Sequence, residues 1–171
     1  MDLKVTERPF VDRDDFINAM RHVAASVTVV TTNGPAGKHG ATVSAFASVS
    51  ADPPTVMVCL RSESRIAKAV RENGNYAVCV LPKDAKDMAM RFAGSDDLQV
   101  DNRFADVPHK DWEAPHLEDS TSFSCDVVQA VDQGSHTAFF GQVTWAGSSE
   151  KPPLVYFDGA FGEFMKGADH G

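Results

Sequence analysis

Alternating and helical hydrophobic patterns divide the chain into short strands and a few helices. A hydrophobic period of two residues predicts a strand, and a period near 3.6 predicts a helix. Strand-like runs cover residues 26–32, 41–50, 55–60, 75–81, 123–131, 136–146 and 154–157. Helical runs cover residues 12–23, 64–73 and 83–93. Because turns rather than helices connect most strands, the pattern favours a mainly β protein, a closed antiparallel β-barrel with flanking helices.

The alternating run at residues 40–54 is the most informative segment. Read as one strand, it places hydroxyls and one aromatic ring on one face, namely Thr42, Ser44, Phe46, Ser48 and Ser50. Small apolar side chains take the other face, namely Val43, Ala45, Ala47, Val49 and Ala51. Short hydroxyls let a flat, polar-edged molecule approach both side chains and backbone closely. The run therefore predicts a shelf for a cofactor, and the alternative is the solvated face of an edge strand.

A candidate phosphate site follows the strand at residues 55–60. Ser64 precedes a helical pattern, and Arg65 stands beside it. A helix N-terminus offers unpaired N–H donors and a partial positive charge, so these two residues can hold a phosphate group. The alternative is an ordinary N-cap serine followed by a solvated arginine.

These segments resemble the flavin reductases of the FMN-binding split-barrel fold, which supply reduced flavin to two-component monooxygenases. The matching pieces occur in the family's order and are residues 16–32, 40–60 and 62–80, Phe92-Ala93, Arg103-Phe104, Gly134-Ser135-His136, and Pro153-Leu154-Val155-Tyr156. The chain departs from the family at Ser135, where aspartate is common, and at Ala45 and Ala47, where hydroxyls are more usual.

The resemblance implies an antiparallel FMN-binding split barrel and a homodimer whose second subunit helps to build each site. It implies FMN or FAD as the flavin, NADH or NADPH as the hydride donor, and a flavin-dependent monooxygenase as the recipient. The implied flavin contacts are Thr42, Val43, Ser44, Ala45 and Ser48, the backbone of Cys59 and Leu60, and Phe92. Ser64 and Arg65 would hold the phosphate, and His136 would serve the nicotinamide as the catalytic residue.

Several of these residues also have plainer interpretations. Phe92 lies on the apolar stripe of a helix, where most such residues are core. His136 begins a strand just after a turn, where a histidine is usually an ordinary surface residue. Tyr156 and Phe161 offer flat rings that can close over a cofactor, or they can pack against the barrel.

Composition narrows the class of protein further. The 171 residues fit one domain, residues 1–171, with residues 164–171 expected to form a disordered tail. A net charge of −8 disfavours nucleic acid and anionic membranes as partners. No stretch is long and apolar enough for a membrane helix or a secretion signal, so a cytoplasmic location is expected. The three cysteines lie in apolar runs and the histidines lack ligand spacing, so small buried thiols and no metal site are expected.

Hydride transfer between nicotinamide and flavin needs no acid, base or nucleophile from the protein, because the two rings carry the chemistry. The absence of serine hydrolase, Rossmann and phosphate-loop motifs fits this expectation. Two alternatives stay open. One is a split-barrel flavoprotein that keeps FMN tightly and acts on its own small-molecule substrate, and the other is a split barrel that binds a ligand without turnover.

Overall fold

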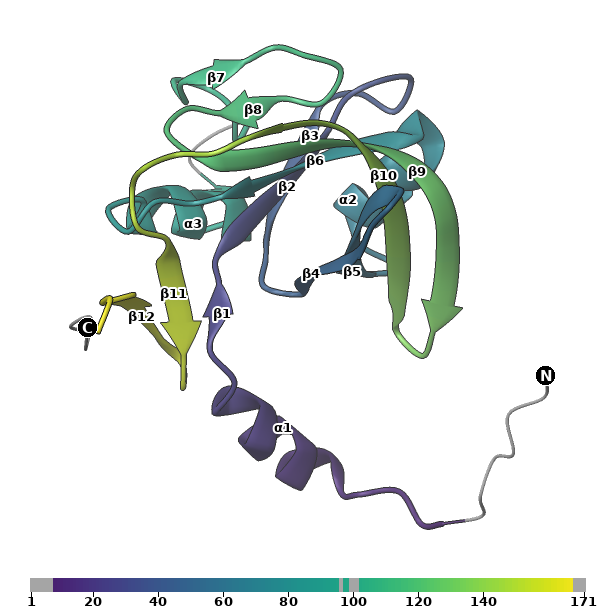
Figure 1. Cartoon of the computed structure of the whole chain (residues 1–171). Helices are drawn as coiled ribbons and strands as arrows, with labels where there is room; N and C mark the ends of the chain where they lie inside the picture. Colours follow the sequence, from purple (N-terminus) through teal and green to yellow (C-terminus); the bar gives the residue numbers. More distant parts are fainter. Residues whose placement is uncertain (1–7, 96, 99–101, 168–171) are drawn as a thin grey trace.

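A curved sheet of seven antiparallel strands forms the body of the protein (Figure 1). The computed structural model describes residues 8–95, 97–98 and 102–167. The strands follow one another across the sheet in the order β3-β2-β6-β9-β10-β5-β4. Their bounds are β2 Thr28–Thr32, β3 His39–Val43, β4 Phe46–Ala51, β5 Pro54–Arg61, β6 Asn75–Val80, β9 Thr121–Gln133 and β10 His136–Gly147. The mainly antiparallel architecture and its strong curvature agree with the split barrel expected from the sequence.

Two smaller sheets flank this body. One joins β1 (Ala25–Ser26), β11 (Leu154–Phe157) and β12 (Ala160–Glu163), and the other pairs β7 (His109–Lys110) with β8 (His116–Leu117). The strand-like runs predicted from the sequence do not include β7, β8 or β12. β7 and β8 have two residues each, which is too short to show a period, and β12 has four residues, of which Gly162 has a low strand propensity. Only their pairing reveals these strands.

The three expected helices are present as α1 (Arg13–Arg21), α2 (Arg65–Asn73) and α3 (Lys86–Ala93). The Asp12 side chain caps α1 by accepting a hydrogen bond from the Asp14 N–H. Helices α2 and α3 end at Gly74 and Gly94, whose φ angles of 74° and 95° are left-handed. Glycine adopts this conformation without a Cβ clash, which explains why both helices stop where the sequence predicted.

The core fills the space between the sheet and the two packed helices, α2 and α3. Tyr76 is fully buried there, and its hydroxyl lies 3.3 Å from the carbonyl oxygens of Val56 and Phe139, to which it donates. Burial raises the pKa of Tyr76 and raises that of the neighbouring Cys125 thiol to about 12. Cys79 and Cys125 are buried as expected, whereas Cys59 is only partly buried.

The run at residues 40–54 is not one strand, and this corrects the prediction. It forms β3 and β4, which lie at opposite ends of the strand order. Ser44 and Ala45 make the corner between them, where the Phe46 N–H donates to the Ser44 carbonyl. After the corner the faces are exchanged: Phe46 packs against the core, while Val49 is half exposed. The bulky ring takes the buried position because its burial removes the most apolar surface from water.

Helix α1 carries an apolar stripe, but it buries no residue in this chain. It projects away from the sheet (Figure 1), and Phe16 and Met20 on its stripe are 55% and 49% exposed. The expected tail lies partly outside the described residues, at 168–171, while residues 164–167 are exposed. No helix in the described part of the chain is long and apolar enough to cross a membrane.

Candidate functional site

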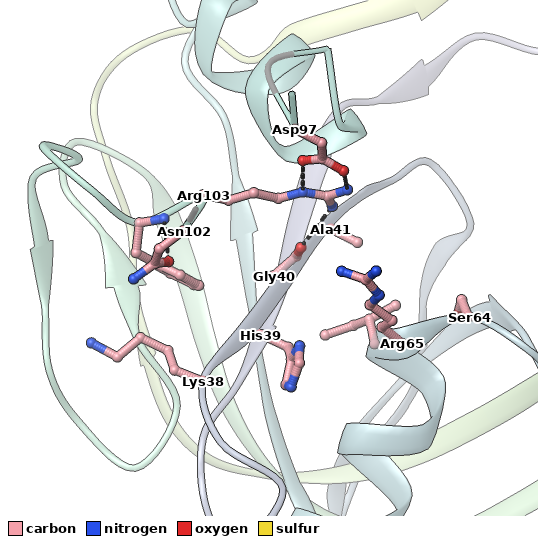
Figure 2. Close-up of a pocket in the computed structure, with 11 residues that line it drawn as sticks. Lys38, His39, Gly40, Ala41, Ser64, Arg65, Asp97, Asn102 and Arg103 are labelled. Carbon is pink, nitrogen blue, oxygen red and sulfur yellow. Dashed lines mark hydrogen bonds and ion pairs between the residues drawn. The ribbon is translucent and has the colours of Figure 1, made fainter. Parts of the chain in front are cut away.

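A pocket of about 760 Å³ opens between β3, the first turn of α2 and the segment that carries Asp97 and Arg103 (Figure 2). Its wall combines backbone from His39 to Ala41 with the side chains of Arg65 and Arg103. The pocket therefore lies between β3, which is the first half of the alternating run, and the helix start predicted at Ser64 and Arg65.

The first turn of α2 supplies hydrogen-bond donors to this pocket. The Ser64 hydroxyl accepts from the Ala67 N–H at 3.2 Å and donates to the Arg61 carbonyl at 2.6 Å. Ser64 therefore holds the turn through its side chain, as an N-cap does. Arg65 and Ile66 of this turn line the pocket, and N–H groups in the first turn of a helix have no intrahelical acceptor. Arg65 extends its guanidinium into the same space (Figure 2).

Arg103 forms the opposite wall and is held by four hydrogen bonds. Its Nε and Nη2 donate to the two carboxylate oxygens of Asp97 at 2.8 and 2.7 Å. Its Nη1 donates to the carbonyls of Gly40 and Phe92 at 3.1 and 2.7 Å. The bond from Arg103 lowers the pKa of Asp97, and the bond to Asp97 raises the pKa of Arg103. Such a fork fixes the guanidinium in one orientation.

Gly40 allows the wall to close over two phenyl rings. A Cβ at this position would lie 2.6 Å from the Phe92 ring and 3.0 Å from the Phe104 ring. These rings pack edge to face with their centroids 5.0 Å apart, and Phe92 is fully buried. Phe92 thus supports the pocket from beneath and is not among its lining residues, as the core interpretation of this residue expects.

Lys38 adds a third cation to the pocket. Its ammonium pairs with Asp111, lies 3.3 Å from His109 Nε2, and stands 5.6 Å above the Phe104 ring. Together Lys38, Arg65 and Arg103 surround the space, with Asp97 as the acidic side chain among the residues that line it. Cationic side chains beside a helix N-terminus suit a ligand that carries phosphate groups.

The predicted shelf is only partly available. The Thr42 hydroxyl donates to the Ala89 carbonyl at 2.6 Å, so it is turned toward α3. The Cys59 N–H donates to the Ala45 carbonyl at 3.0 Å and ties the corner to β5. Ser44 and Ala45 are exposed at that corner, and Ser48 is exposed on β4.

The remaining predicted contacts differ in burial and in position. Val43 is partly buried against the core, and Leu60 is buried. Tyr156 lies on β11, in the sheet of β1, β11 and β12. The centroid of its ring is 5.4 Å from that of the Phe161 ring, and neither residue lines the pocket. In this chain Tyr156 therefore belongs to a different surface from the cationic pocket.

His136 begins β10 opposite Arg61 of β5 and is exposed. Its Nδ1 lies 2.9 Å from the Ser135 hydroxyl, so the serine that departs from the family pattern contacts the histidine directly. The Ser135 carbonyl accepts a 3.0 Å hydrogen bond from the Ser62 N–H. The hairpin that carries His136 therefore lies against the turn that leads into Ser64, and the tertiary structure brings these two predicted site residues close together.

Sequence reasoning missed Lys38 and Gly40 as site residues and recognised Arg103 only as part of a family motif. Nothing in the local pattern marks the first two, because they meet α2 and the segment around Asp97 only in the folded chain. Across the described residues, no group of three or more His, Cys, Asp or Glu side chains could hold a metal ion.

A curved antiparallel sheet of this kind is consistent with a split-barrel protein, and its cationic pocket at a helix N-terminus suits a ligand that carries phosphate groups. The chain belongs to the flavin reductase like domain family, whose pattern matches residues 20–165.

Individual relatives agree with this assignment. A flavin reductase (NADH) of Kitasatospora aureofaciens is 40% identical over 158 residues, covering 86% of this chain and 79% of that protein. The reductase component of a 4-nitrophenol 4-monooxygenase/4-nitrocatechol 2-monooxygenase of Rhodococcus opacus is 33% identical over 159 residues, covering 91% and 83%. The solved structure of flavin reductase PheA2 superposes with a TM-score of 0.81 at 34% identity, covering 91% of this chain and 100% of that one.

Proposed function

We propose that this protein is an NAD(P)H-dependent flavin reductase that reduces FMN or FAD and passes the reduced flavin to a separate monooxygenase. The observation that carries the proposal is the pocket in which the first turn of α2, Arg65 and Arg103 converge, set in a flavin reductase fold. The relatives named as a flavin reductase (NADH) and as the reductase component of a monooxygenase support the same reaction and the same kind of partner.

The flavin supplies the redox chemistry when bound, by accepting a hydride from the reduced nicotinamide. The protein's task is to bind and orient the two molecules, because near-contact between reacting atoms removes much of the entropic barrier. We assign the flavin phosphate to Arg65 and the free N–H groups at the start of α2. The exposed corner at Ser44 and Ala45, with Ser48, would meet the ring.

His136 is assigned to the nicotinamide. The hairpin that carries His136 lies against the turn before Ser64, and His136 does not line the pocket, which supports this assignment. The Ser135 hydroxyl at 2.9 Å can fix the orientation of the imidazole. The side chain is therefore suited to contact the dinucleotide from the open side of the site.

The reaction is tested by following NADH or NADPH oxidation with the pure protein, with and without FMN or FAD. We expect oxidation that depends on added flavin and saturates with it. If none of the four combinations of nicotinamide and flavin gave a flavin-dependent rate, the proposal would be overturned. Tight retention of flavin through gel filtration, with turnover of another acceptor, would instead indicate a flavoprotein with its own substrate.

We further propose that the protein functions as a homodimer. The exposed apolar stripe of α1 is the supporting observation, because an amphipathic helix with no buried residue leaves apolar surface in water. Val128 and Val131 on β9 are also exposed, at 57% and 41%. Light scattering of the full chain should give twice the chain mass, and Phe16→Asp should shift the protein toward monomer. A wild-type protein that is monomeric at high concentration would contradict this assignment.

A further inference from the structure

A second pocket, of about 480 Å³, is lined by residues of β8 and of the end of β10. It shares no lining residue with the cationic pocket described above. The chain contains two tryptophans, Trp112 and Trp145, and both line this pocket. The concentration of both indoles at one place is the feature that needs an explanation.

Three rings form a continuous aromatic surface there. Trp112 and Trp145 meet edge to face with centroids 4.8 Å apart, and the His116 ring lies 4.6 and 5.1 Å from them. The two indoles are 41% and 43% exposed, so much of their aromatic surface faces solvent. Exposed indoles are costly in water and are typical of binding sites, where they offer a large, rigid contact surface.

His116 supplies the second observation. The residue is only 4% exposed, and its Nδ1 is buried without a hydrogen-bond partner among the described residues. Its other nitrogen, Nε2, lies 2.8 Å from the Ser124 hydroxyl. Burial, together with the nearby Lys110 charge, lowers the pKa of His116, so the ring is neutral at pH 7. A buried polar atom without a partner is unfavourable, and a hydrogen-bonding group of a ligand that reached Nδ1 would remove this cost.

The charges around the pocket largely offset one another. Asp119 pairs with Lys151 at 2.8 Å, and Lys151 also lies 3.7 Å from Asp84. Lys110 and Glu118 line the pocket with opposite signs, and neither has an ion pair among the described residues. Lys110 stands 5.6 Å from the Trp112 ring centroid. The rest of the lining consists of the three rings, Leu117, a glycine and four serines, so it favours a neutral ring with a polar group over an ionised one.

We propose that this pocket is a second binding site, for an uncharged aromatic molecule that carries a hydrogen-bonding group. The ring of the molecule stacks on one indole and meets the other edge to face, and its polar group bonds to His116 Nδ1. The proposal does not depend on the flavin reductase assignment, because no residue of the cationic pocket takes part.

The test uses the two indole N–H signals of the full-length chain in ¹H–¹⁵N spectra, since each tryptophan gives one. We expect phenol to shift both signals saturably, with a Kd below about 10 mM. Cyclohexanol keeps the hydroxyl but lacks the aromatic face, and it should bind at least about fivefold more weakly. Benzoate and benzylammonium test the charge, and binding of either one tenfold tighter than phenol would overturn the preference for a neutral ligand.

Three variants complete the test. Trp145→Ala should weaken phenol binding at least about fivefold, read from the Trp112 signal. Phe164→Ala removes another exposed ring and should leave the affinity unchanged. His116→Phe keeps a flat ring but removes both nitrogens, and phenol should then bind no better than toluene. A dispersed Trp112 signal shows that each variant is folded.

Three outcomes would overturn the proposal: shifts that do not saturate, an equal response to cyclohexanol, or unchanged binding in Trp145→Ala. The titration is repeated with saturating FMN and with saturating FAD. Competition between phenol and flavin would also overturn it, because the pocket would then belong to the flavin.

Discussion

The hydroxyl of Thr137 donates a 2.6 Å hydrogen bond to the carboxylate of Asp132, across the hairpin that carries His136. Arg71 of α2 donates to the same carboxylate at 2.8 Å, and the Ser62 hydroxyl lies 3.0 Å from that of Thr137. These contacts tie the last turn of α2 and the turn before Ser64 to the start of β10. The network therefore connects the two ends of the proposed site.

Asp132→Asn should impair use of the nicotinamide more than binding of the flavin. The amide keeps the shape of the side chain but loses the charge that pairs with Arg71. We expect the KM for NADH to rise about fivefold, with a change in flavin Kd of less than about twofold. Asp126→Asn, on the same strand and exposed, serves as the control in steady-state kinetics. Equal effects on both ligands would indicate general loss of structure instead.

The same carboxylate predicts a loss of stability in acid. Hydrogen bonding from Thr137, followed by the charge of Arg71, lowers the pKa of Asp132 below its ordinary value. A group whose pKa is lowered by folding stabilises the protein above its unfolded pKa of about 3.9 and loses that contribution as the pH falls through the folded value. The melting temperature should decrease as the pH is lowered below about 4. The decrease should be less steep in Asp132→Asn. Parallel melting curves for the two proteins between pH 5 and pH 3 would contradict this.

Arg65→Ala should weaken flavin binding at least about tenfold, because a charge-assisted contact to phosphate is lost. Lys68→Ala is the matched control, since Lys68 lies on the same helix and pairs with Glu63 at 2.9 Å. Quenching of flavin fluorescence gives both dissociation constants. The effect of Arg65→Ala should shrink as salt increases, because screening weakens the contact that the variant lacks. An affinity in Arg65→Ala equal to that in Lys68→Ala would remove Arg65 from the site.

His136→Ala should raise the KM for the nicotinamide or lower the rate of hydride transfer, while the flavin Kd stays near that of the native protein. The imidazole lies on the hairpin tip, outside the cationic pocket. Stopped-flow measurement of flavin reduction separates binding of the nicotinamide from the transfer step. Unchanged kinetics in this variant would leave His136 as an ordinary surface residue.

Gly40→Ala should destabilise the fold by about 1–3 kcal/mol, because overpacking forces rings or backbone to move. The added methyl would lie 2.6 Å from the buried Phe92 ring. Gly162→Ala, where no atom lies within 4 Å of the added methyl, should change stability by less than about 0.5 kcal/mol. Chemical denaturation of both variants checks the difference. Comparable stability of the two variants would mean that the Phe92 and Phe104 rings move aside at little cost in free energy.

The sequence predicted correctly those helix ends and turns that are fixed by residues close together in the chain. Helix α2 begins at Ser64, because its hydroxyl caps the Ala67 N–H, and ends at Gly74, because that residue adopts a left-handed φ. The hairpin between β9 and β10 turns at Gly134, with a φ of 58°. A cap hydrogen bond and a left-handed glycine each depend on residues only a few positions apart, so the sequence pattern is enough to predict them.

Alternation failed where the chain changes its direction within the sheet. Residues 40–51 alternate without interruption, yet Ser44 and Ala45 form a corner that separates β3 from β4. A period of two reports which residues share a face only while the strand stays straight. Whether it stays straight depends on the curvature of the sheet and on the burial of Phe46, which are properties of the assembled core.

By itself the sequence determined the class of fold, the start of α2 after Ser64 and the start of a strand at His136 just after a turn. Only the tertiary structure decided that Lys38, Gly40 and Arg103 share one pocket with Arg65, and that Phe92 lies beneath it. Capping and turn formation are local, whereas a pocket wall is made by segments far apart in the chain. Their meeting depends on how the sheet closes around its core, and no short stretch of sequence encodes that.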